Sequence, residues 1–154
     1  MNFIVNLLIL LPAHIASYFS WAGPLLMRLI VGYTFMLTGW GKLTNLAQVT
    51  ENFVGWGIPF PKILTPFVSG VECFGGAMLI LGLFTRIPAA MLAVVMLVAI
   101  KSAKWSDVDS LETLFGFEEM TYFGAFMWLA IAGPGVASLD RLLVNAAGHP
   151  EKST

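Results

Sequence analysis

The sequence predicts an all-α integral membrane protein, a four-helix bundle with an additional N-terminal apolar helix that is interfacial or a partial span. Of the 154 residues, 58% are hydrophobic and 11% are charged, whereas about a quarter of the residues of a soluble domain are charged. The mean hydropathy is +0.83. Because so few charges cannot coat four soluble helices, a soluble all-α protein with buried helices is the less favoured interpretation.

Turn-forming residues mark the limits of four predicted spans, each approaching the roughly 20 apolar residues that cross a bilayer core. Pro24, Pro66 and Pro88 sit at or near the first turn of three of them, where a missing N–H is tolerated. The Gly-Pro-Gly sequence at 133–135 ends the fourth. The four predicted spans cover residues 24–41, 66–84, 87–101 and 119–132.

The chain divides into an anchor (1–21), a four-helix transmembrane domain (22–143) and a short polar tail (144–154). The anchor carries no Lys or Arg before its hydrophobic run, so it does not resemble a cleavable signal peptide. We expect Pro12 to break it near the middle, and we interpret it as an interfacial helix or a partial fifth span. Ser138 is expected to cap a surface helix that ends at Gly148.

Four spans of alternating direction place both termini on one side of the membrane. Lys and Arg are about evenly divided between the two sides, so their count does not orient the protein. Every arginine lies on the terminal side, which favours cytoplasmic termini. The loop at 102–118 is acidic and must be solvated, whereas the loop at 43–65 carries aromatic residues typical of a membrane surface.

Glu72 lies inside the second predicted span and is the most informative residue. Counted from Pro66, it lies roughly 9 Å below the loop side, where an ionised carboxylate is costly and must face the interior, pair or be protonated. We favour Lys101 as its partner on depth, with Arg28 as the alternative, and expect Lys42 to cap the first span. Two interpretations remain open: Glu72 is a structural clamp, or it is a polar group at the wall of a substrate cavity.

Other residues of the bundle are interpreted as structural. Asp140 is expected to pair with Arg86 or with Arg28, so that the three residues lock helix ends together. Small residues recur every four positions in the second span and predict close helix packing, with a matching surface on the third. These small residues are Ser69, Cys73 and Ala77 on the second span and Ala89 and Ala93 on the third.

Several classes of function are excluded by composition. The single cysteine, Cys73, excludes an intramolecular disulfide and a dithiol motif. His14 and His149 lie at opposite ends of the chain, so no metal site is predicted. The net charge of −1 provides no basic surface for nucleic acid.

The aromatic residues near the loop side suggest a site for a flat ring. If a cavity opens there, we expect Lys42, Trp40 and Tyr122 to bind a ring such as a quinone. Glu72 and Lys101 are the candidate catalytic residues. Glu72 would exchange a proton or a hydrogen bond with the head group, and Lys101 would tune its charge.

Four motifs together resemble the DoxX family of small bacterial membrane proteins, over about residues 24–143. The resemblance implies a multi-pass four-helix bundle of the bacterial inner membrane with cytoplasmic termini. The recurrent polar positions of the family fall on Arg28, Lys42, Glu72, Arg86 and Asp140. The motifs are RLIVGYTFMLTGWGKL, GIPFP, VECFGGAMLILGLFTRIPA and GPGVASLDRLL.

The resemblance also implies a redox-associated membrane subunit, because members are linked to thiosulfate–quinone oxidoreduction, to an oxidoreductase complex for thiol and oxidative stress, and to metal-stress operons. The chain has no haem, flavin or nucleotide motif, so its electron carrier would be a quinone or a centre in a partner.

We therefore expect a membrane-embedded accessory subunit of a quinone- or thiol-linked oxidoreductase system, with a quinone-like pocket near Glu72. It would have no covalently bound cofactor, and its partners would be lipid and other membrane subunits. The alternative is a non-catalytic scaffold subunit of a larger membrane complex. A small transporter is less favoured, because no pair of broken helices is evident within the bundle.

Overall fold

The computed structural model describes residues 2–148, and the elements within this range are helical. Three helical segments are long and apolar enough to cross a membrane, and a shorter helix of 15 residues, α8, completes the bundle. The third long segment, Arg86–Asp107, contains three consecutive elements. The bundle comprises α3 (Ala22–Thr44), α5 (Pro61–Leu81), α6 (Arg86–Ala99), the π-helix η2 (Ile100–Lys104), the 3-10 helix η3 (Trp105–Asp107) and α8 (Glu118–Ala132).

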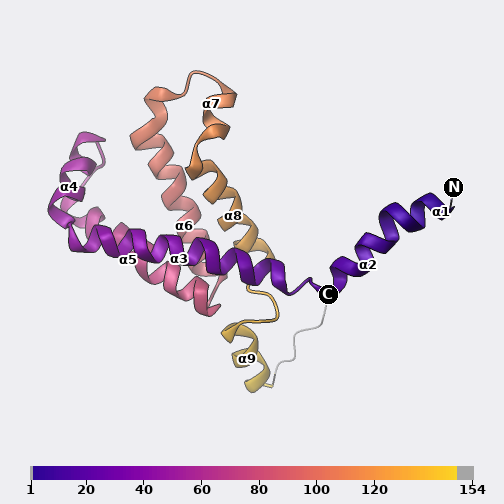
Figure 1. The fold of residues 1–154 in the computed structure, drawn as a ribbon. Helices are drawn as coiled ribbons and strands as arrows, with labels where there is room; N and C mark the ends of the chain where they lie inside the picture. Colours follow the sequence, from indigo (N-terminus) through magenta and orange to yellow (C-terminus); the bar gives the residue numbers. More distant parts are fainter. Residues whose placement is uncertain (1, 149–154) are drawn as a thin grey trace.

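Shorter helices lie before, between and after these segments. Residues 2–18 form an N-terminal arm that projects away from the bundle (Figure 1). The connection between α3 and α5 contains one helix, the connection between η3 and α8 contains another, and one more follows α8. These elements are α1 (Asn2–Val5), the π-helix η1 (Asn6–Leu10), α2 (Leu11–Tyr18), α4 (Leu46–Gly55), α7 (Leu111–Gly116) and α9 (Leu139–Ala146).

Helices α3 and α5 lie side by side along most of their length, and α6 packs on α8 (Figure 1). Glycines allow α3 and α5 to approach closely. A Cβ at Gly39 would lie 2.2 Å from the backbone N of Cys73, and a Cβ at Gly76 would lie 2.4 Å from that of Met36. Gly76 belongs to the predicted small-residue surface of the second span, whereas Gly39 of α3 was not predicted to take part. These contacts fix the offset between α3 and α5.

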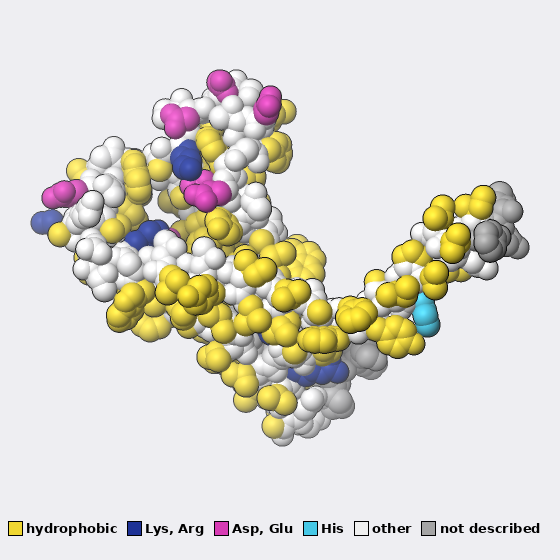
Figure 2. Space-filling view, viewed as in Figure 1, with side chains coloured by type: hydrophobic (Ala, Val, Ile, Leu, Met, Phe, Trp, Pro, Cys, Tyr) yellow, Lys and Arg dark blue, Asp and Glu magenta, His cyan; other side chains and the backbone are white. Residues whose placement is uncertain are grey.

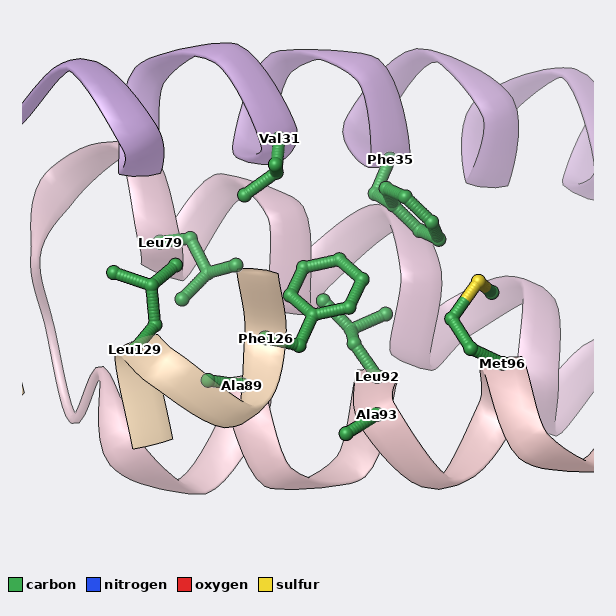
Figure 3. Close-up of a cluster of buried hydrophobic side chains, with 9 residues drawn as sticks. All are labelled: Val31, Phe35, Leu79, Ala89, Leu92, Ala93, Met96, Phe126 and Leu129. Atoms are coloured by element: carbon green, nitrogen blue, oxygen red, sulfur yellow. The ribbon is translucent and has the colours of Figure 1, made fainter. Parts of the chain in front are cut away.

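The hydrophobic core lies where these two helix pairs meet. Phe126 of α8 points between α3 and α6, and its ring meets Phe35 edge to face at 4.8 Å between centroids (Figure 3). Phe35 also meets Tyr122 edge to face at 5.1 Å, an arrangement that aromatic quadrupoles favour. The core cluster comprises Val31, Phe35, Leu79, Ala89, Leu92, Ala93, Met96, Phe126 and Leu129.

The largest difference from the predicted spans is at the start of the second one. The second span begins at Pro61 rather than Pro66, which lies inside α5. Proline is tolerated at the first helical position, and Pro61 occupies it. The helix continues through Pro12 in the arm as well, because η1 widens there and Leu11 N–H donates to Asn6 O, five residues back.

The end of the described chain agrees with the predicted cap. The Ser138 hydroxyl accepts a hydrogen bond from the Arg141 N–H at 3.3 Å, and α9 begins directly after it. The last residues of the predicted polar tail, including His149, lie outside the described residues.

Candidate functional site

A cavity of about 660 Å³ opens between the α3–α4–α5 side of the molecule and the α6–η2–α8 side. Figure 2 shows the surface hollowed in this region, with basic and acidic side chains near its wall. Most of the lining is apolar. Polar groups are the minority, as is typical of sites that bind small molecules. The apolar lining includes Phe53, Trp56, Ile58, Leu64, Phe67, Val68, Val71, Met91, Val94, Val95, Met96, Val98 and Ala99.

An ion pair between α3 and α5 lies at the wall of this cavity. The Nζ atom of Lys42 lies 2.6 Å from Oε1 of Glu72, and both residues line the cavity. Glu72 is buried with 1% of its surface exposed, whereas the Lys42 side chain keeps 32%. The prediction that Glu72 lies hidden within the bundle is confirmed.

The predicted partner of Glu72 was wrong: Lys42 occupies that position instead of Lys101 or Arg28. The physical reason is the start of α5. Counted from Pro61, Glu72 lies roughly 16 Å along the helix, and the close packing of Gly39 on the Cys73 backbone brings the C-terminal turn of α3 beside it. Lys101 is exposed and lies with its Nζ 4.4 Å above the Trp105 ring.

A second ion pair lies at the opposite wall and was not foreseen. Lys104 Nζ of η2 lies 3.0 Å from Glu119 Oε1 of α8, and both residues line the cavity. Lys104 lies within the acidic loop at 102–118 and Glu119 begins the fourth predicted span, so opposite charge was the sequence signal for this pair. π-helical turns such as η2 are frequent at functional sites because they redirect side chains out of the regular helical register.

Each pair leaves one carboxylate oxygen without a partner. Oε2 of Glu72 and Oε2 of Glu119 are buried and have no hydrogen-bond partner among the described residues. Buried polar atoms in proteins nearly always have a hydrogen-bond partner. These two oxygens are therefore unsatisfied acceptors on residues that line the cavity. As part of an ionised carboxylate paired with lysine, each of these oxygens accepts hydrogen bonds and donates none.

Of the three residues predicted to bind a ligand, two line the cavity and one does not. Lys42 and Tyr122 belong to its lining, whereas Trp40 is 62% exposed and outside it. Trp40 is on the outer face of α3 because Gly39 and Lys42, its neighbours in the helix, face α5 and the cavity. Lys101, the second predicted catalytic residue, is also outside the lining.

At the other end of the bundle, charged side chains bind the main chain rather than each other. Arg28 is 1% exposed and donates from Nη2 to the Ala137 carbonyl at 2.5 Å. Gly82 packs against it, since a Cβ there would lie 2.1 Å from Nη1. Arg86 donates from Nη1 to the carbonyls of Ala130 and Ile131 at 3.1 and 2.6 Å, at the C-terminus of α8.

Asp140, at the same end of the bundle, also binds main-chain groups. Its Oδ1 accepts from the Phe84 N–H at 2.6 Å and its Oδ2 from the Thr85 N–H at 3.0 Å. Its own N–H donates to the Gly82 carbonyl at 3.0 Å. The expected ring of Arg28, Arg86 and Asp140 is therefore replaced by bonds to the backbone, because the helix ends there present unpaired N–H and C=O groups. No direct ion pair joins the three in the described chain.

Comparison with known proteins places the chain in a family of membrane proteins. The chain is 31% identical to the inner membrane protein YqjF of Escherichia coli (strain K12) over 121 residues, which is 79% of this chain and 92% of YqjF. It is 28% identical to the inner membrane protein YphA of the same organism over 132 residues, or 80% of this chain and 94% of YphA.

A more distant relative carries a name that mentions redox chemistry. The Bacillus subtilis (strain 168) protein named "Putative oxidoreductase CatD" is 29% identical over 82 residues, or 53% of this chain and 60% of that protein. No solved structure matches the chain. The DoxX family model matches residues 23–105, from α3 to the start of η3. With this match over more than half of the sequence, and the two Escherichia coli relatives covered nearly end to end, the chain belongs to the DoxX family.

Proposed function

We propose that this protein is a membrane-embedded accessory subunit of a redox system and that it binds the head group of a quinone-like molecule in the cavity at Lys42 and Glu72. The observation that carries the proposal is the buried Oε2 of Glu72, which has no partner in the described chain and belongs to a residue that lines a largely apolar cavity. The redox name of a distant relative also supports it.

The cavity fits such a molecule in size and chemistry. Its volume of about 660 Å³ lies within the range of roughly 300–1,000 Å³ typical of small-molecule sites. The apolar walls suit a substituted ring and the first part of an isoprenoid tail, and the Tyr122 hydroxyl and Lys42 ammonium are able to hydrogen-bond ring oxygens. A bound quinone supplies two-electron, two-proton chemistry, and the electrons would come from a centre in a partner subunit.

The proposal is tested by filling the cavity from α6. Ala99 lines the cavity, whereas Leu97, two positions earlier on the same helix, is 45% exposed and outside the lining. We expect Ala99→Phe to weaken binding of a short-chain benzoquinone by about tenfold or more, because the added ring occupies the ligand volume. Leu97→Phe is the matched control and should bind as the parent protein does.

The measurement is isothermal titration calorimetry on protein in nanodiscs, with empty nanodiscs as the blank. Equal binding by the two variants would contradict the proposed site. Binding by the parent protein no stronger than by empty nanodiscs would contradict the proposed function itself.

The N-terminal arm supports a second candidate, a non-catalytic scaffold role in a larger membrane complex. The arm projects from the bundle (Figure 1), and its apolar side chains are exposed, including Leu8 at 67% and Ile9 at 61%. Under this alternative, deletion of residues 2–18 should release a stoichiometric membrane partner while the bundle stays folded. Native gel electrophoresis of mildly solubilised membranes, with and without the arm, tests it.

We also propose cytoplasmic termini. The arginines Arg28, Arg86 and Arg141 lie toward the terminal end of the bundle, and the acidic loop with Asp107 lies toward the other. An impermeant maleimide applied to intact cells should label Asp107→Cys and leave Asn145→Cys unlabelled. The native Cys73 is buried and provides the low background. The reverse labelling pattern would invert the orientation.

A further inference from the structure

Resting on the proposed function, we infer that the cavity binds the reduced, hydroxyl-bearing form of a quinone-type ring more tightly than the oxidised form. Glu72 and Glu119 line the cavity, and the buried side-chain atom that each leaves without a partner is a hydrogen-bond acceptor, Oε2. An unsatisfied acceptor requires a donor. A quinol carries two O–H donors, whereas a quinone presents two carbonyl acceptors only.

At both ion pairs, the contact with lysine leaves the glutamate with a free acceptor rather than a free donor. Lys42 Nζ lies 2.6 Å from Oε1 of Glu72, and Lys104 Nζ lies 3.0 Å from Oε1 of Glu119. Each contact has the geometry of a charge-assisted hydrogen bond between an ammonium and a carboxylate. Because each carboxylate already has a cation beside it, a neutral donor such as a ring hydroxyl complements the site better than a second cation does.

The donors of the cavity wall are largely engaged or exposed. Each lysine donates to its glutamate and keeps 32% or 34% of its side-chain surface exposed, so its remaining N–H groups do not depend on a ligand for partners. The Tyr122 hydroxyl both donates and accepts, and therefore serves either form of the ring. The other lining hydroxyls donate within their own helices, Thr34 to Ile30 O, Thr38 to Thr34 O and Ser102 to Val98 O.

An oxidised ring in the cavity would leave the two buried acceptors without partners and place further acceptors beside them. A buried acceptor that lacks a donor carries its full desolvation cost, whereas one that gains a donor does not. We therefore expect the quinol to bind about tenfold more tightly than the matching quinone, the ratio that one such hydrogen bond produces.

The test compares decylubiquinone with decylubiquinol, titrated under nitrogen into the full-length protein in nanodiscs by calorimetry, with empty nanodiscs as the blank. Glu72→Gln places an N–H donor beside the acceptor position, and we expect it to bring the ratio of the two dissociation constants close to one. Glu119→Gln makes the same change at the second pair. Glu112→Gln, an exposed carboxylate of α7 outside the lining, is the matched control and should keep the parent ratio.

Tighter binding of the quinol by the parent protein, lost in Glu72→Gln or Glu119→Gln and kept in Glu112→Gln, supports the inference. Equal affinities, or tighter binding of the quinone, overturn it and leave the proposed function standing. Binding of neither form above the blank overturns the proposed function as well. If Glu72→Gln does not fold by circular dichroism, Glu119→Gln decides, and a ratio unchanged in that variant overturns the inference.

Discussion

The two ends of the bundle use the same kinds of charged side chain in different ways. At the terminal end, Arg28, Arg86 and Asp140 bind main-chain groups of helix ends and turns. At the loop end, Lys42 binds Glu72 and Lys104 binds Glu119, with a cavity between the two pairs. A charged side chain that hydrogen-bonds the backbone stabilises the fold directly. A charge paired with another side chain leaves part of its hydrogen-bonding capacity for a ligand.

The space around the charges differs as well. Arg28 also has unpaired N–H groups, at Nε and Nη1, but Gly82 lies against its guanidinium so closely that even a Cβ would not fit. Glu72, in contrast, is among the residues that line a cavity of about 660 Å³. Burial of an unpaired polar atom is therefore common to both ends of the described chain, and at the loop end it is combined with room for a molecule.

The largest loss of stability is expected when the packing of α3 on α5 is disrupted. This packing extends along most of both helices. Gly39→Ala places a Cβ 2.2 Å from the Cys73 backbone N, so the helices must separate, and we expect a loss of about 3 kcal/mol or more of unfolding free energy. Gly41→Ala is the control, since nothing lies within 4 Å of its Cβ. Unfolding in detergent followed by circular dichroism measures both, and equal stabilities would refute the close contact.

The next largest loss of stability should distinguish the two ion pairs at the loop end, Lys42–Glu72 and Lys104–Glu119. Lys42→Met leaves Glu72 buried without its cation, and we expect a cost of about 2–3 kcal/mol. Lys104→Met should cost less than about 1 kcal/mol, because that pair is more exposed. In a double-mutant cycle, Lys42→Met with Glu72→Met should recover much of the loss. Strictly additive losses would argue against coupling across the pair.

A smaller loss is expected at the terminal end from Asp140→Ala. The N–H groups of Phe84 and Thr85 lose their carboxylate acceptor, which we expect to cost about 2 kcal/mol of unfolding free energy. Ligand affinity at the loop end should stay unchanged in the folded variant, because the cavity does not include these residues. Asp107→Ala, at an exposed aspartate of η3, is the control. A change in affinity without a change in stability would contradict this division of roles.

The smallest effect concerns the exposed loop before α7. A hydrogen bond from the Thr113 hydroxyl, with further bonds from the nearby backbone and Ser110, lowers the pKa of Asp109 below its ordinary value. Because the folded pKa is depressed, these bonds stabilise the loop above the unfolded-state pKa, and the stabilisation is lost as the pH falls through the folded pKa. Thr113→Ala should raise the pKa of Asp109 in a carboxyl NMR titration.

Thr113→Ser keeps the hydroxyl and serves as the control for that titration. An Asp109 pKa that is the same in the alanine and serine variants would show that the backbone bonds, rather than the hydroxyl, lower it. Because Asp109 is fully exposed, the effect should stay local to the loop and leave both ends of the bundle as they are.

The sequence anticipated the candidate site only in part. The burial of Glu72 followed from a carboxylate within an apolar stretch, and the end of the fourth helix followed from the Gly-Pro-Gly turn. The lysine partner did not follow, because the depth of Glu72 was counted from Pro66 and α5 starts at Pro61. The Lys104–Glu119 pair depends on the π-helical turn η2, which no sequence pattern indicated.

Hydrophobicity and turn chemistry are local properties, so the sequence by itself determined the all-helical membrane fold, the order of its apolar helices and the concealment of Glu72. Which lysine meets that carboxylate was decided by tertiary structure. The offset of α3 against α5 is set where Gly39 lies on the Cys73 backbone, and the cavity exists because the α6–α8 pair diverges from these helices at the loop end (Figure 1). Both depend on how distant surfaces pack together, which spacing along one helix does not encode.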